Sequence, residues 1–417
     1  MSLKNAKIAI LHTFSRNDST SIGALVIKDE LERKGYHVDF CDYSSAFNYT
    51  HVLVSMTSTD DIFHIYAGCK KNNWQNRTFK ALVGGFGCQN PIALSDYIDY
   101  AFFGRTDGII EDVLINHLKF KEHLFKISKP HMVSIRQVSE CYPNSIKHNG
   151  AKWREKSIGC PVKCKFCSFS HTRDWVKGEY ETFEWLLKGR TQEVLIKDIP
   201  EKVIKKQGWV KSAIDGYSER LRFKYGKKFA TWENIENALD HLCTFKGTTK
   251  LQLYNIHNFP TETKEDIIEF FDFFNNYVED AYKGDGKLIV EIHNTPFRPT
   301  LCTPMERQGA KLFPAAKPQV GLLNNYFNYL PVKPNSLTIA SKNNIHVKFS
   351  VFIENPFKHL KGLISIRYSD KDIIEEILRI ESMSGVKALD YCIKNIDITP
   401  YIREYKENED LKFKWIK

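Results

Sequence analysis

Lys156-Ser-Ile-Gly-Cys160-Pro-Val-Lys-Cys164-Lys-Phe-Cys167-Ser168 contains three cysteines within eight residues, with the spacing Cys-x3-Cys-x2-Cys. A closed structural zinc site uses four ligands, and an iron–sulfur cubane held by protein alone also uses four. Three thiolates leave one metal position open, and an open iron can bind a small molecule. The spacing therefore predicts a catalytic cluster loop, and Gly159 and Pro161 suit a tight turn around it.

This stretch resembles the cluster loop of the radical S-adenosylmethionine (SAM) superfamily, with Phe166 as the aromatic residue before the third cysteine. The resemblance implies that Cys160, Cys164 and Cys167 hold a 4Fe–4S cluster and that SAM occupies the fourth iron. It also implies reductive cleavage of SAM to a 5′-deoxyadenosyl radical, with an electron donor such as flavodoxin or ferredoxin as a partner. The cofactor performs the difficult chemistry, while the protein orients and shields it.

A second interpretation of the same residues is a zinc site. His171 follows Cys167 at a spacing that zinc ligands use, so three thiolates and one imidazole could complete a tetrahedral set. In that case the protein is a zinc-stabilised binding protein without catalysis. Metal content separates the two interpretations. The radical SAM interpretation predicts iron and sulfide, whereas the zinc-site interpretation predicts a single zinc ion per chain.

Length and composition set outer limits. The chain has 417 residues, enough for two or three domains, and no apolar run long enough to span a membrane is expected. The N-terminal residues lead straight into a strand-like segment, so no secretory signal is expected. Ten cysteines without a disulfide-framework spacing favour a reducing, cytoplasmic location.

The net charge of +10 permits a nucleic-acid partner or an anionic substrate. However, the sequence contains no Arg-rich tract, and no RNA-binding signature is recognisable. A coding bias that enriches lysine explains the charge better than either partner does. Modification of nucleic acid or nucleotides by radical SAM chemistry remains an alternative without a motif behind it.

The first 125 residues alternate apolar strand-like runs with helical patterns, which predicts an α/β fold with a doubly wound, flavodoxin-like parallel sheet. Ligands of such sheets lie beyond the carboxyl ends of the strands. Helices are expected at 21–34 and 109–118. Strands are expected at 7–12, 37–43, 51–56, 81–84 and 100–103.

A small doubly wound domain before a radical SAM core resembles the cobalamin-binding subfamily. The matching segments are Leu53-Val-Ser55, Val83-Gly-Gly85 and Asp99-Tyr-Ala-Phe-Phe-Gly104. The resemblance implies that Ser55, Gly84 and Gly85 contact cobalamin. The Asp-x-His-x-x-Gly ligand motif of base-off cobalamin enzymes is absent, and a flavodoxin-like domain without a cofactor is the alternative.

Two further segments resemble the SAM-binding parts of the same family. Asp215-Gly-Tyr-Ser-Glu-Arg-Leu-Arg222 matches the family's Glu-x-Gly-Ser-Glu-Arg-Leu-Arg, with Tyr217 in place of a glycine. This implies that Asp215, Ser218 and Arg222 bind SAM. The strand that ends at Ile256 and continues into Phe259-Pro260 implies an apolar contact between Ile256 and the adenine.

The remaining elements predict a partial (β/α)6 barrel over 151–305, joined to the first domain by a connector at 126–150. Strands are expected at 193–197, 211–215, 251–256 and 287–293, with a helix at 231–242 whose N-cap is Thr231. An α+β C-terminal cap over the barrel mouth is expected at 306–417, and a stability domain without substrate contact is the alternative. Its predicted elements are helices at 317–330 and 373–384 and strands at 345–352 and 362–367.

The predicted function is a radical SAM enzyme for cobalamin-assisted methylation or rearrangement of an unidentified substrate. The sequence assigns no general acid or base and does not name the substrate. Several polar residues fall at predicted strand ends, where catalytic groups of barrels lie. These are Tyr254, His257, Glu262, His293 and Arg298.

Overall fold

The structure is a computed structural model of the 417-residue chain. The residues it describes are 5–12, 21–88, 91–102, 106, 108–115, 124–126, 145–148, 151–154, 157–171, 175–177, 192–204, 208–280, 286–300, 303–310, 337–342, 345–350, 356–366 and 371–404. Within these ranges, no helix is long and apolar enough to cross a membrane.

The first sheet has the order β2-β1-β3-β4-β5-β6, and its first five strands are parallel. This is the flavodoxin-like order of doubly wound sheets, and the strands predicted in the first 125 residues are confirmed. The strands are β1 (Ile8–His12), β2 (Val38–Cys41), β3 (His51–Ser55), β4 (Lys80–Gly84) and β5 (Tyr100–Phe102), with β6 (Leu124–Lys126) antiparallel to β5.

Both faces of the first sheet are covered, because successive side chains of a strand point to opposite faces. Leu53 and Leu82 pack with α1 (Ile22–Arg33) and α3 (Ile110–Ile115) on one face. Val54 and Val83 pack on the other face with α2 (Asp61–Lys71), which the sequence did not predict.

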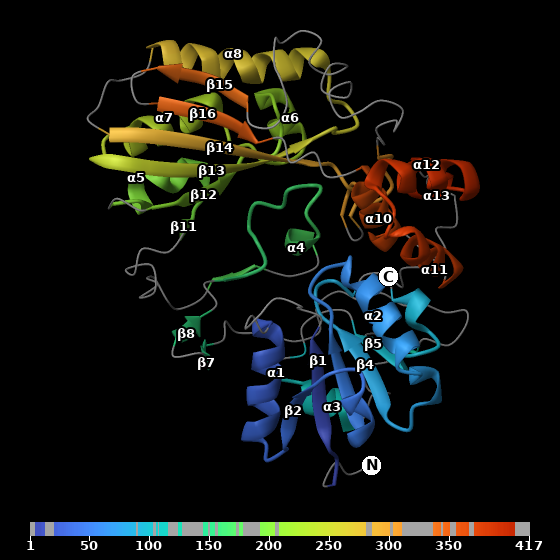
Figure 1. Cartoon of the computed structure of the whole chain (residues 1–417). Coiled ribbons are helices and arrows are strands. Elements are labelled where there is room, and N and C mark those ends of the chain that lie inside the picture. The colour runs from blue at the N-terminus through green and yellow to red at the C-terminus, as the bar shows by residue number, and fades with distance from the viewer. Residues whose placement is uncertain are drawn as a thin grey trace.

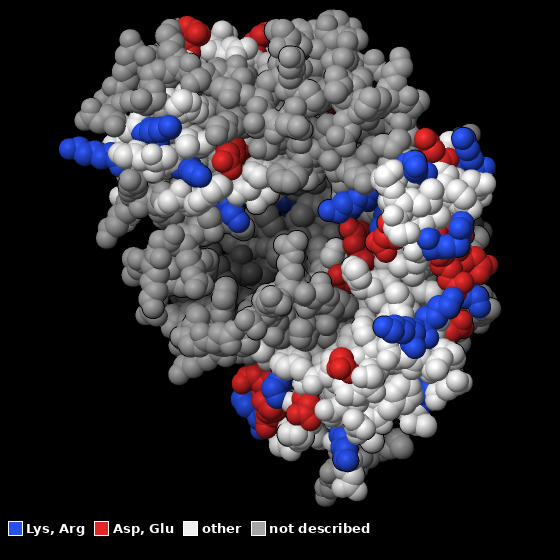
Figure 2. All heavy atoms as spheres, in the orientation of Figure 1, with Lys and Arg blue, Asp and Glu red and all other residues white. Residues whose placement is uncertain are grey.

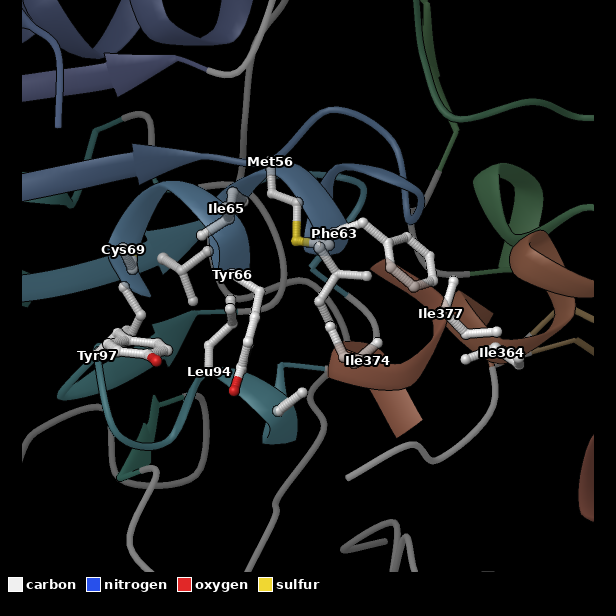
Figure 3. Close-up of a cluster of buried hydrophobic side chains, with 14 of the residues drawn as sticks. Met56, Phe63, Ile65, Tyr66, Cys69, Leu94, Tyr97, Ile364, Ile374 and Ile377 are labelled. Carbon is white, nitrogen blue, oxygen red and sulfur yellow. The ribbon is translucent and has the colours of Figure 1, made fainter. Parts of the chain in front are cut away.

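C-terminal helices complete the second covering layer of this sheet. Figure 3 shows Phe63 of α2 in one cluster with Ile364 of α10 (Pro356–Ile366) and with Ile374 and Ile377 of α11 (Lys371–Ile380). Glu375 of α11 accepts hydrogen bonds from Tyr66 and Lys70 of α2, at 2.5 and 2.7 Å. The helices α12 (Gly385–Asn395) and α13 (Thr399–Ile402) contribute to the same core.

The second sheet has the order β11-β12-β13-β14-β16-β15. It is parallel except for β15 (Leu337–Lys342), which pairs antiparallel with β16 (Ile345–Ser350). Its other strands are β11 (Gln192–Glu193), β12 (Val210–Ala213), β13 (Gly247–His257) and β14 (Gly286–Pro296). The described residues thus form two mainly parallel α/β sheets, and the partial (β/α)6 barrel remains a prediction.

One face of the second sheet packs against α5 (Ile199–Lys202), α7 (Trp232–Cys243) and α8 (Lys264–Asp280), as Figure 1 shows. The core between them contains Leu253, Val290 and Phe270. Thr231 caps α7 as expected, because its Oγ1 accepts a hydrogen bond from the Asn234 N–H at 3.1 Å. The opposite face of this sheet carries polar, partly exposed side chains and borders the candidate site.

Three predicted elements are not confirmed by the structure in the form predicted. Residues 362–366 form the end of α10 instead of the predicted strand, because Leu360, Leu363 and Ile364 lie on one helical face that the first sheet's core buries, and residue 367 lies outside the described residues. The strand expected at 193–197 stops at Glu193, and a 3-10 turn at Ile196–Asp198 leads into α5. The helix expected at 317–330 lies outside the described residues.

The C-terminal segment contributes to both sheets. β15 and β16 extend the second sheet, whereas α10 to α13 pack on the first. The sequence predicted a single cap over the barrel mouth for 306–417. The packing of α10 and α11 against α2 shows that this segment also joins the two parts of the molecule.

Candidate functional site

The cysteine loop runs between β9 (Ser157–Ile158) and the short helix α4 (Ser168–His171), which lies between the two sheets in Figure 1. Its turn is closed by a hydrogen bond from the Cys167 N–H to the Cys164 carbonyl at 3.1 Å. The loop docks on the end of α6 (Glu219–Lys224), because the Lys165 N–H donates to the Tyr225 carbonyl at 2.9 Å. Gly159 has a φ of 67°, which glycine adopts without strain.

All three cysteines of the loop are free thiols. Cys164 is buried, whereas Cys160 and Cys167 are partly exposed. Burial raises the pKa of the Cys164 thiol to about 12; Lys227 opposes this rise, and Asp215 and the other two thiols add to it. The three thiols are thus close enough to interact electrostatically, and a metal bound here would have to displace the Cys164 proton.

The three thiols of the loop are a donor set that a 4Fe–4S cluster could use. Among the residues that the structure describes, no three His, Cys, Asp or Glu side chains converge to hold one metal ion. A single zinc ion needs all its ligands within about 2.0–2.3 Å, whereas a cubane places each thiolate on a different iron. The Nε2 of His171 is hydrogen-bonded to the Cys164 carbonyl at 3.0 Å, so that nitrogen is engaged with the backbone.

An aromatic cluster joins the cysteine loop to the end of the second sheet. The Phe166 ring lies 5.6 Å from that of Phe259, which stacks on Tyr225 at 4.3 Å. Beside this cluster is a cavity of about 280 Å³. Its lining consists of Phe166, Ile256, Thr295, Pro296, Phe297, Arg298 and Thr300. The structure therefore brings together two residues predicted to bind SAM, Phe166 and Ile256.

The turn after β12 lies beside the cysteine loop. Asp215 has a φ of 48° and forms a buried ion pair with Lys227. The Gly216 N–H donates to Asn255 Oδ1 at 2.6 Å, and Asn255 Nδ2 donates to Asn294 Oδ1 at 2.7 Å. This buried amide pair links the ends of β13 and β14 to the turn, so the position of Asp215 is fixed by the neighbouring strands.

Two other predicted SAM contacts are fully buried at the start of α6. Ser218 caps this helix, accepting from the Leu221 N–H at 3.2 Å, and donates to Asp266. Arg222 lies 3.9 Å from the centre of the Trp232 ring and donates to the Gly216 carbonyl at 3.2 Å. Burial lowers the pKa of Arg222 to about 10 despite the nearby Glu219 and Glu269. Both side chains support the turn, and their contact with SAM stays a prediction.

The predicted cobalamin contacts lie at the carboxyl edge of the first sheet. Ser55 ends β3, Gly84 ends β4, and Gly85 follows with a φ of 111°. A Cβ on Gly85 would lie 2.4 Å from the Met56 carbonyl oxygen, so this glycine permits two turns of the chain itself to meet. Backbone packing therefore explains the glycine at position 85, and the role of Gly84 and Gly85 in cofactor binding stays a prediction.

This edge faces the cysteine loop. The rings of Phe86, after β4, and Phe169, in α4, are 6.0 Å apart. Arg298, which lines the cavity, also contacts two other parts of the chain. Its Nη1 lies 3.8 Å from Oδ2 of Asp60, the residue before α2, and its guanidinium packs against Gly362 of α10. Figure 2 shows blue Lys and Arg side chains interspersed with red Asp and Glu side chains over the described surface of the first sheet and the C-terminal helices.

The remaining candidate residues fall into separate groups. Tyr254 and His293 are neighbours on β13 and β14, with ring centres 5.7 Å apart. Glu262 instead accepts a hydrogen bond from the Asn258 N–H at 2.9 Å, beyond the end of β13. His257 is the last residue of β13.

Several residues of the site were not predicted from the sequence. Lys227 holds Asp215, and Thr295 and Thr300 line the cavity. Gln252 contacts His293. The alternation of apolar and polar residues in Leu251-Gln-Leu-Tyr254 and Val290-Glu-Ile-His293 could have identified the polar face, because residues two apart share one face of a strand.

Comparison with known proteins gave matches at the level of structure alone. No protein-family model matches the sequence, and a search of curated proteins found no match either. Among solved structures, the chain is similar to the radical S-adenosylmethionine methyltransferase TsrM from Kitasatospora setae, solved with cobalamin and a 4Fe–4S cluster bound. The TM-score is 0.39 at 10% identity, over 93% of this chain and 100% of that one.

A second similar structure is the cobalamin-dependent S-adenosylmethionine radical enzyme OxsB with aqua-cobalamin bound. The TM-score is 0.27 at 11% identity, over 95% of this chain. The chain spans 56% of the length of OxsB. Both of these structural neighbours are thus radical SAM enzymes whose structures contain cobalamin.

Proposed function

We propose that the protein is a radical SAM enzyme whose cluster loop is Cys160 to Cys167. The observation that carries this proposal is the placement of three free cysteines, spaced Cys-x3-Cys-x2-Cys, on one loop beside the cavity lined by Phe166 and Ile256. The three thiolates would hold a 4Fe–4S cluster and leave one iron open. When bound, the cluster and SAM would together supply a 5′-deoxyadenosyl radical.

The chain's own residues would bind and shield these groups. The cavity of about 280 Å³ offers apolar walls from Phe166, Ile256 and Phe297 and hydroxyl groups from Thr295 and Thr300. Small-molecule sites usually combine an apolar lining with a few placed polar groups. The aromatic cluster of Tyr225 and Phe259 packs behind this wall and keeps water from that side of the cysteine loop.

We further propose that cobalamin binds at the carboxyl edge of the first sheet. Ligands of doubly wound sheets lie at this edge, and the Phe86–Phe169 contact brings it beside the cysteine loop. A cofactor held there would lie between the sheet and the cluster. The reaction would then be cobalamin-assisted methylation or rearrangement of the substrate.

The test of radical chemistry uses protein purified without oxygen and reconstituted with iron and sulfide. After addition of dithionite and SAM, 5′-deoxyadenosine is measured by mass spectrometry. We expect product from the wild type and none from Cys160→Ala, Cys164→Ala or Cys167→Ala. Cys41→Ala, in β2 of the first sheet, is the matched control and should retain product.

Two results would overturn the proposal. Stoichiometric zinc without iron after reconstitution would favour a zinc-stabilised binding protein. If each of the three cysteine variants still assembled the cluster as the wild type does, the cluster would have to be bound elsewhere in the protein. For cobalamin, incubation with hydroxocobalamin followed by gel filtration should leave the corrin spectrum with the protein, and its complete loss would reject that part of the proposal.

A further inference from the structure

The polar face of the second sheet is organised in pairs. This face lies opposite α5, α7 and α8, and its side chains come from alternate positions of β13 and β14. The strand register sets three successive pairs side by side. They are Gln252 with Glu291, Tyr254 with His293, and Ile256 with Thr295.

His293 is the centre of these contacts. Its Nε2 lies 2.9 Å from Gln252 Nε2 and 3.9 Å from Glu291 Oε2. Its ring centre is 5.7 Å from that of Tyr254. The side chain of His293 is 17% exposed and the residue Tyr254 is 37% exposed, so a ligand can reach both.

Burial favours the neutral imidazole of His293. It lowers the pKa of this group most, Glu291 opposes the shift, and Lys211 of β12, the strand beyond β13, lowers the pKa further, with a net shift downward. A neutral imidazole has one N–H donor and one acceptor nitrogen. Because Gln252 Nε2 donates to His293 Nε2, the imidazole proton lies on Nδ1, and this N–H can donate to an oxygen acceptor without the cost of desolvating a charge.

The pair is close to the candidate cofactor cavity. Ile256 and Thr295 line that cavity, and they are two residues further along the same two strands. Two residues of a β-strand span about 6.6 Å. A molecule lying on Tyr254 and His293 would therefore be next to anything bound against Phe166 and Ile256.

We propose that Tyr254, His293 and Gln252 form the substrate-binding site, which takes a small polar molecule. A hydroxyl oxygen of this molecule accepts a hydrogen bond from the imidazole of His293, while its body rests on the Tyr254 ring. Gln252 positions the imidazole by holding Nε2. That the bound molecule is a substrate rests on the proposed radical SAM function, whereas binding itself does not.

The test compares two probes of nearly equal shape, phenol and fluorobenzene, by ligand-detected NMR on the full chain without cluster or SAM. We expect phenol to bind about fivefold more tightly, because one neutral hydrogen bond contributes about 1 kcal/mol. In His293→Leu the two affinities should become equal. Tyr254→Leu should weaken both probes by a similar factor.

The control variant is His37→Leu. The side chain of His37 is 82% exposed and the residue precedes β2 of the first sheet, so this variant should leave the phenol preference unchanged. In the wild type, the His293 Cε1–H signal should shift with phenol and much less with fluorobenzene, which tests the contact without a substitution. Equal affinities in the wild type, or a phenol preference that survives in His293→Leu, would overturn the proposal. Because no 5′-deoxyadenosine is measured, these outcomes are independent of the radical chemistry.

Discussion

The two sheets of this protein share a parallel arrangement but differ in what covers them. The first sheet is packed on one face by α1 and α3 and on the other by α2, α10 and α11. The second packs on one face against α5, α7 and α8, and its other face carries Tyr254, His293 and other polar side chains. Parallel sheets are normally buried on both faces, so a polar face on such a sheet indicates a surface for a ligand.

The difference between the two sheets is also visible in the sequences of their strands. In the first sheet, both sets of alternate residues are apolar, as in Val52, Leu53 and Val54. In β13 only one set is apolar, since Leu251 and Leu253 alternate with Gln252 and Tyr254. Substitutions on the covered faces should therefore change stability, and those on the polar face should change binding.

The largest effect is expected where the covered face joins distant parts of the chain. Phe63→Ala removes a fully buried ring between α2 and α11, so the free energy of unfolding should fall by about 3–5 kcal/mol. Urea denaturation measures this. Phe223→Ala, at a 40% exposed ring on α6, should cost less than about 1 kcal/mol. Equal costs would mean that the C-terminal helices do not seal this face.

The next effect concerns Asp266, which supports the helical side of the second sheet. It accepts hydrogen bonds from Ser218, from Arg220 Nε at 3.1 Å and from the Thr263 N–H at 2.8 Å. Burial alone would raise the pKa of Asp266, but Arg220, Ser218 and Thr263 outweigh it and lower the pKa. Asp266→Asn should therefore cost about 2 kcal/mol at pH 7.

The stabilisation by Asp266 depends on pH, and the direction of its pKa shift sets that dependence. Because the folded-state pKa of Asp266 lies below its ordinary value of 3.8, its contribution is fully present above that value. It is lost as the pH falls through the lower, folded-state pKa. Urea denaturation of wild type and Asp266→Asn should show the stability difference shrinking below pH 4 or so; a constant difference down to pH 2 or so would contradict this.

A smaller effect is expected at the start of α7. Thr231→Ala removes the cap that accepts from the Asn234 N–H, and this should cost about 1 kcal/mol. Thr231→Ser keeps the hydroxyl and serves as the control. A thermal denaturation series compares the two, and an alanine variant as stable as the serine variant would show that the cap contributes nothing.

The smallest effect is expected on the polar face. Tyr254→Ala should change the free energy of unfolding by no more than about 0.5 kcal/mol, because the side chain is 37% exposed and packs on His293 from one side. Urea denaturation again provides the measurement. A loss comparable with that of Phe63→Ala would show that this face is part of the core, and the contrast between the two sheets would fail.

Local patterns predicted much of the fold. The alternation of strands and helices in the first 125 residues, the N-cap at Thr231 and the strands β13 and β14 are all present in the structure. The prediction for 362–367 was wrong, because a run such as Leu363-Ile-Ser-Ile366 suits a strand or a helix equally well locally. Burial of Leu360, Leu363 and Ile364 against the first sheet decided for the helix.

The spacing of Cys160, Cys164 and Cys167 is a covalent property of the chain, so the predicted cluster loop can be read from the sequence alone. Which residues lie beside these cysteines depends on how distant segments fold together. Phe166 and Ile256 are far apart in sequence but line one cavity, whereas Ser218 and Arg222 are occupied in supporting α6. The reason is physical: strand register and the burial of apolar faces, rather than neighbourhood along the chain, set which side chains meet.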